Sequence, residues 1–163
     1  MAVTSIWTVH RSIKDALDYA ANPEKTENPN EEDLRRLMDY AENPDKTEQR
    51  YLISGVNCLP ELAYERMMET KRRYGKYGGI VAYHGYQSFK PGEVTPEQCH
   101  ALGVELAKRL WGDKYEVLVA SHRDHEHLHN HFILNSVSFK DGEKFHCPPY
   151  YHDTVMAPES DKL

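Results

Sequence analysis

Five of the ten histidines in this chain fall within one ten-residue segment, residues 122–131. His129 and His131 are separated by a single residue, and side chains two positions apart on a β-strand project to the same face. Neutral imidazole suits divalent ions such as Zn, Mn, Ni and Fe, and no cysteine occurs in the segment to favour a thiolate site. The segment therefore predicts a metal site with an open coordination position.

The third ligand of this site has two candidates, His122 and His127. We expect His122, which ends the preceding apolar run, because three ligands at alternate positions of one strand would spread along about 13 Å. His127 would then lie behind the ligands. Asp124 is expected to orient a ligand imidazole through its other ring nitrogen.

Two tyrosines occur in nearly identical local sequences, Tyr19 in residues 17–26 and Tyr40 in residues 38–47. Two copies are too few to form a solenoid, and each tyrosine could simply be a packing residue at the end of a helix. A phenol, with a pKa of about 10, can nevertheless attack a phosphodiester when a metal or a base activates it. Beside a bound metal, these tyrosines suggest a transesterification through a phosphotyrosine intermediate.

A basic and aromatic cluster, residues 71–77, has the composition of a surface that follows a phosphate backbone and stacks bases. Its alternative is a solvated helix end, favoured by the helix dipole. The formal net charge of −6 argues against a nucleic-acid protein, but much of the acidic excess lies in residues 24–48. The predicted nucleic-acid contacts in the cluster are Lys71, Arg72, Arg73 and Lys76.

The chain's 163 residues, 39% hydrophobic and 28% charged, are typical of one soluble domain. We expect a catalytic domain over residues 1–146 and a C-terminal tail over residues 147–163, with more chain beyond it in the whole protein. The polar residues 157–163 at its end are expected to be disordered. No run is long enough to span a membrane, so the expected compartment is the cytoplasm and no membrane partner is expected. The three cysteines show no paired spacing and are interpreted as reduced thiols.

Hydrophobic periodicity and turn residues predict alternating strands and helices. The fold class expected is α+β, a central, mostly antiparallel sheet of about five strands with helices packed on its faces. Strands are expected at 5–10, 51–54 and 79–89 with two more between 115 and 139, and helices at 12–20, 31–42, 60–74 and 95–111.

Three blocks of this sequence resemble the histidine-hydrophobe-histidine relaxases, in particular the MOBP-like mobilisation nucleases of Gram-positive bacteria. The first is the helix carrying Tyr19 with the Asn-Pro-Glu-Lys-Thr segment that follows it, and the second is the stretch His84–Glu93. The third combines residues 122–124 with residues 129–131 and Asn135. The resemblance covers residues 3 to 146.

This resemblance implies nicking of single-stranded DNA at an origin of transfer, with the 5′ phosphate held on a tyrosine. Tyr19 would be the nucleophile, with Tyr40 as the alternative. Asp124 and His84 would complete the catalytic group, His84 through phosphate binding or proton transfer. The implied metal ligands are His122, His129 and His131, and the implied backbone contacts are Ser88 and Lys90.

Mn or Mg is the ion expected in function, although Zn or Ni could occupy the site in a purified sample. The partners that the resemblance implies are single-stranded DNA, an accessory DNA-binding protein and a type IV coupling protein. Three other functions are compatible with the histidine cluster: a rolling-circle replication initiator that shares the metal and the tyrosine, a tyrosine-independent metallohydrolase in which water attacks, and a noncatalytic metal-dependent DNA-binding module.

Overall fold

The computed structural model describes residues 2–10, 12–21, 52–122 and 127–163. Its centre is a five-stranded sheet with the order β1-β3-β5-β4-β2, in which every neighbouring pair is antiparallel. The strands are β1 (Val3–Val9), β2 (Ile53–Val56), β3 (Ala82–Ser88), β4 (Val117–His122) and β5 (His129–Asn135). The α+β class expected from the sequence is confirmed.

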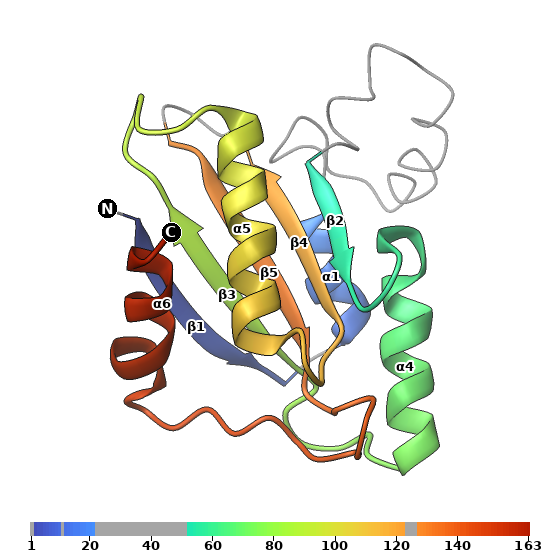
Figure 1. Ribbon diagram of the computed structural model, residues 1–163. Coiled ribbons are helices and arrows are strands. Elements are labelled where there is room, and N and C mark those ends of the chain that lie inside the picture. The colour runs from blue at the N-terminus through green and yellow to red at the C-terminus, as the bar shows by residue number, and fades with distance from the viewer. Residues whose placement is uncertain (1, 11, 22–51, 123–126) are drawn as a thin grey trace.

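Helices cover both faces of this sheet (Figure 1). The helix α5 (Pro96–Trp111) crosses one face together with the C-terminal helices, and α1 (Ile13–Ala20) and α4 (Ala63–Tyr74) pack on the other. We call these the α5 face and the α1 face. All six residues of β4 are buried, as expected for a strand covered on both sides.

Each face has its own apolar cluster, because alternate residues of each strand project to opposite sides. Val117 and Val119 of β4 join the cluster under α5, whereas Leu118 joins the cluster under α1 and α4. The same alternation sends His122, His129 and His131 to the α1 face, since they share the parity of Leu118 and Ile133.

Local signals account well for the helices. Thr95 and Gln98 form a reciprocal capping box at the start of α5, and Pro96 occupies its first turn. The helix expected at 60–74 begins as a 3₁₀ turn, Pro60–Leu62, and continues as α4. The left-handed Gly75 (φ 64°) ends it. The helix expected at 31–42 lies outside the described residues.

The C-terminal residues 157–163, which were expected to be disordered, are largely helical. A π-helical turn (His152–Met156) leads directly into α6 (Ala157–Asp161). Tyr151 and Met156 belong to the core cluster under α5, and Met156 is fully buried. This segment therefore packs against the same sheet through Tyr151 and Met156, and the boundary expected at residue 146 stays a prediction.

No helix within the described ranges is long and apolar enough to cross a membrane.

Candidate metal centre and nucleophile

The three histidines that were expected as metal ligands lie together at one end of the β4–β5 hairpin. We call this the histidine end of the sheet; the far end is where β4 begins. His122 and His129 are register partners, and His131 pairs with Ala120 two residues further along. One ring nitrogen from each of the three lies within 4.8 Å of the others. His122 is fully buried, His131 is 7% exposed and His129 is partly buried, so two of the three imidazoles are shielded from bulk water.

Hydrogen bonds to two of these imidazoles indicate which nitrogen faces an ion. His122 Nε2 donates to the carbonyl oxygen of Ala20 at 2.6 Å, so Nδ1 is its coordinating nitrogen. His131 Nδ1 lies 2.7 Å from Nε2 of His84, so His131 would coordinate through Nε2. Metal-binding histidines are commonly held in this way, with the second nitrogen bonded to a protein acceptor. The donor set therefore fits a divalent ion of borderline softness.

The other residues predicted near the metal have different outcomes. His127 is exposed and is not part of the three-histidine group. Asp124 lies outside the described residues. His84 supplies one supporting bond of this kind, because its Nε2 contacts His131 directly. The role expected of Asp124 stays a prediction.

Tyr19 lies near the end of α1, over the histidine end of the sheet. Its ring is 5.9 Å from the ring of His84 and 6.0 Å from that of His131, in edge-on geometry with both. The side chain is 42% exposed, so a large substrate can reach it. Tyr40 lies outside the described residues, so Tyr19 is the tyrosine of this pair whose position relative to the histidines is described.

Two aromatic residues of this site were not found from the sequence. Trp7 of β1 stacks on His84, with ring centroids 4.5 Å apart and planes 22° apart. Tyr86 lies beside both His129 and His131. Strand alternation places each on the correct face, but their meeting with the histidines depends on pairing between strands distant in sequence. Burial and, next, the neighbouring His122 lower the pKa of His84 to about 4, so its imidazole is neutral at pH 7.

The predicted DNA contacts divide between the two ends of the sheet. Ser88 is the register partner of His129 at the histidine end, and the exposed Lys90 follows it closely in the chain. The four residues predicted from the basic cluster lie instead at the far end, around the C-terminus of α4.

Within that cluster, the prediction for Lys71 is wrong. Its side chain is 2% exposed, and Nζ donates to the carbonyl oxygen of Val81 at 2.7 Å and to Ser136 Oγ at 3.0 Å. Burial, with Lys144 adding to it, lowers the pKa of Lys71 to about 8. Lys76 donates to the carbonyl oxygen of Gly142. Lys71 therefore holds the far end of the sheet together and does not face DNA.

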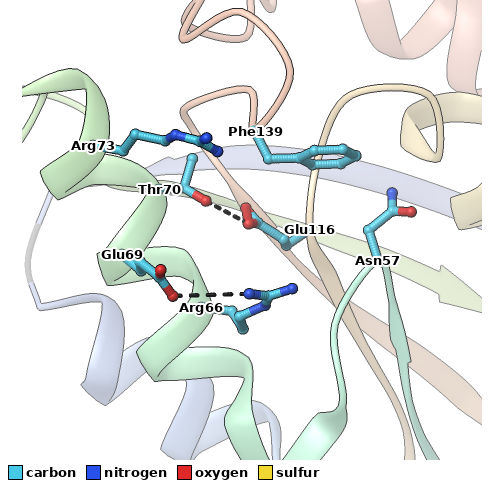
Figure 2. Close-up of a pocket in the computed structure, with 7 residues that line it drawn as sticks. All are labelled: Asn57, Arg66, Glu69, Thr70, Arg73, Glu116 and Phe139. Atoms are coloured by element: carbon cyan, nitrogen blue, oxygen red, sulfur yellow. Dashed lines mark hydrogen bonds and ion pairs between the residues drawn. The ribbon is translucent and has the colours of Figure 1, made fainter.

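Arg73 points into a hollow of about 220 Å³ at the far end (Figure 2). Arg66 and Glu69 approach from the same helix, and Thr70 donates to the buried Glu116 at 2.6 Å. Two cationic and two anionic side chains line this hollow, so it carries no excess of positive charge for a phosphate backbone. Arg72 is exposed, but it too lies on α4, away from the histidines.

Comparison with known proteins agrees with this geometry. The family model described as "Relaxase: MobA/VirD2-like, nuclease domain" matches residues 40–157, which include all three histidines and both strands that carry them. The chain belongs to this relaxase family. The match starts after Tyr19 and includes Tyr40.

Among relatives of this relaxase domain, "Protein rlx" of Staphylococcus aureus is 43% identical over 110 residues, which is 68% of the chain and 34% of that protein. "Group II intron-interrupted relaxase LtrB" of Lactococcus lactis subsp. cremoris is 31% identical over 175 residues, 89% of the chain and 31% of that protein. The chain spans about a third of the length of these curated relatives.

Proposed function

We propose that this domain nicks single-stranded DNA at an origin of transfer, using Tyr19 as the nucleophile beside a metal centre held by three histidines. The observation that carries the proposal is the position of Tyr19, whose ring lies 6.0 Å from that of His131 at an exposed edge of the site. The family of the chain supports the same activity.

The residues that would hold the metal are His122, His129 and His131. A divalent ion, Mn or Mg in function, would polarise the scissile phosphate and stabilise the charge that develops on it. The chain's own contribution is to orient the imidazoles, through Ala20 on one side and His84 on the other.

In the nicking step, Tyr19 Oη forms a bond to phosphorus while the bond from phosphorus to the 3′ oxygen breaks. The phenol proton passes to solvent, which reaches this half-exposed side chain, and the departing 3′ oxygen takes up a proton from water. The products are a 5′-phosphotyrosyl protein and a free 3′ hydroxyl, with no net change in protons.

DNA would approach across the open part of the α1 face, over β1 and β3. Trp7 is 45% exposed with one ring face on His84, so the other face can stack on a base. Ser88 and Lys90 lie at the histidine end and would contact the backbone. An accessory DNA-binding protein and a coupling protein remain candidate partners of the whole protein.

The test is incubation of the chain with Mn²⁺ and single-stranded oligonucleotides that span candidate origins from its own element and carry a label at the 3′ end, on the fragment whose 5′ phosphate the tyrosine retains. Products are separated on a denaturing protein gel. We expect label to travel with the wild-type protein and with Tyr40→Phe, and to be lost from the protein in Tyr19→Phe, because only the attacking phenol retains the phosphate.

The opposite pattern, with label lost only in Tyr40→Phe, would transfer the nucleophilic role to Tyr40. Free cleaved DNA from the protein with both tyrosines replaced would mean that water attacks, which is the metallohydrolase alternative. Binding of DNA without any cleavage would contradict catalysis altogether.

A further inference from the structure

A row of buried polar side chains crosses the α5 face directly behind the three histidines. It consists of one residue from each of four neighbouring strands, and each is the register partner of the next. Most of the other buried side chains on this face are apolar. In strand order, the row is Thr4, Gln87, Asn130 and Ser121, whose exposed fractions are 6%, 1%, 0% and 3%.

Asn130 is the centre of the row, and it is bonded to both register partners. Its Nδ2 donates to Gln87 Oε1 at 2.9 Å, and its Oδ1 accepts from Ser121 Oγ at 2.5 Å. Nδ2 also donates to the carbonyl oxygen of Cys99 on α5, at 2.8 Å. Asn130 therefore ties three strands and a helix to one another through a single amide.

The hydrogen bonds continue beyond the row with one consistent direction. Because Ser121 donates to Asn130, it must accept from His100 Nδ1, 2.7 Å away. Burial lowers the pKa of His100 to about 4, so this ring is neutral and its Nε2 accepts from Ser54 Oγ at 2.7 Å. At the other end, Gln87 Nε2 donates to Ser160 Oγ of α6 at 2.9 Å. These hydrogen bonds form one continuous series from Ser54 of β2 to Ser160 of α6.

The close approach of α5 depends on Gly103. A Cβ atom added there would lie 2.4 Å from Asn130 Nδ2, far inside contact distance. The helix and the strand are thus fitted to each other at the residue that separates His129 from His131.

The position of the row matters because strand register decides where the histidines point. A slip of one residue between β4 and β5 would send the coordinating side chains to opposite faces. Because β4 is buried on both faces, its apolar side chains distinguish the two faces less sharply than they would in a half-exposed strand. A directional hydrogen bond between buried register partners is lost when the strands slip. A buried polar residue that selects one register is an established device in coiled coils.

We propose that the Asn130 row is a positioning element of the metal centre: it fixes the register of β3, β5 and β4 and thereby holds the three imidazoles in coordinating geometry. This inference rests on the proposed metal site. The histidine-hydrophobe-histidine pattern has a hydrophobic residue between its two histidines. In this chain the residue at that position is the polar Asn130, which is hydrogen-bonded to residues of both neighbouring strands.

The experiment compares Co²⁺ affinity, and the visible spectrum of the bound ion, among variants of the 163-residue chain. Asn130→Leu keeps the branched shape and removes every hydrogen bond of the amide, and Ser121→Ala removes the hydrogen bonds of Ser121 to Asn130 and His100 with little change in volume. Ser138→Ala is the matched control, because Ser138 is equally buried but lies beyond the far end of β5. Leu106→Ala is the stability control, since it opens a cavity under α5 and removes none of the hydrogen bonds of the row.

We expect Ser121→Ala to weaken Co²⁺ binding roughly tenfold and Asn130→Leu to weaken it further and alter the Co²⁺ spectrum, as loss of outer supports does at other metal sites. Ser138→Ala and Leu106→Ala should bind Co²⁺ within about twofold of wild type, even where Leu106→Ala unfolds more easily. Equal Co²⁺ affinity in Ser121→Ala and Ser138→Ala would overturn the inference. Failure of the wild-type chain to bind Co²⁺ would instead contradict the proposed metal centre itself.

Discussion

At the scale of single residues, the bond between His84 and His131 has the clearest chemical meaning. His131 can coordinate through Nε2 only if its Nδ1 carries the proton, and Nε2 of His84, 2.7 Å away, is the acceptor for that proton. Trp7 lies flat against His84 and keeps its ring in place. A neutral histidine thus performs the supporting role that carboxylates often have at metal sites.

Replacing His84 by Ala should therefore weaken divalent metal binding by roughly 10- to 100-fold, because the His131 ring loses its support. His84→Gln, which keeps an acceptor near the position of Nε2, should recover most of the affinity. Isothermal titration with Mn²⁺ or Co²⁺ measures both variants. Equal affinities for His84→Ala and the wild type would mean that this bond has no part in holding the ion.

At the scale of elements, α4 shows how a charged residue can belong to the interior. Its buried residues are Ala63, Met67, Thr70 and Lys71, which recur at helical spacing on one side. The aliphatic stem of Lys71 packs along this stripe, and its ammonium group reaches the backbone of Val81. Arg72, the next residue, points to solvent.

Lys71→Ala should lower the free energy of unfolding by about 2–3 kcal/mol, because packing is lost and buried acceptors lose a donor. Arg72→Ala should change it by less than about 0.5 kcal/mol. Neither variant should change the affinity of the folded protein for single-stranded DNA. Urea denaturation and fluorescence anisotropy measure the two quantities, and a specific loss of DNA affinity in Lys71→Ala would restore the original interpretation of the cluster.

Elements with strong local signals were predictable. A local signal lies within a few residues of the structure that it determines. Examples are the capping residues of α5, the alternation around His129 and His131, and the turn residues around α1. The DNA contact predicted for Lys71 rested on its charge, whereas its position on the buried stripe of α4 determines where its side chain lies. Trp7 and the Asn130 row could not be found, since both depend on the sheet order β1-β3-β5-β4-β2, which pairs strands far apart in the chain.

At the scale of the whole molecule, the two ends of the sheet have different roles. The histidine end gathers the imidazoles, Tyr19 and the open surface of β1. The far end holds Lys71 and the hollow lined by Arg73 and Glu116. The net charge of −6 describes the whole chain and carries little information about the local surface where DNA is expected to bind.

Stability of the whole fold should fall in mild acid because His100 is buried in its neutral form. Its pKa is about 4 in the folded protein against 6.5 for the free side chain, so the unfolded chain binds the extra proton first. The contribution of the neutral His100 ring to the free energy of unfolding is complete above pH 6.5 and is lost as the pH falls towards 4. This contribution is at most roughly 3 kcal/mol. Unfolding free energies of wild type and His100→Gln across this range should differ in slope, and parallel curves would contradict the assignment.

The stacking of Trp7 on His84 also gives the molecule an optical signal. The chain has two tryptophans, and the other, Trp111, is 1% exposed and donates to Tyr151 in the core under α5. Emission from Trp7 arises at a ring that is 45% exposed and lies one hydrogen bond away from His131. The intrinsic fluorescence of the unlabelled protein therefore contains one component that responds to events at the histidine end and one that serves as an internal reference.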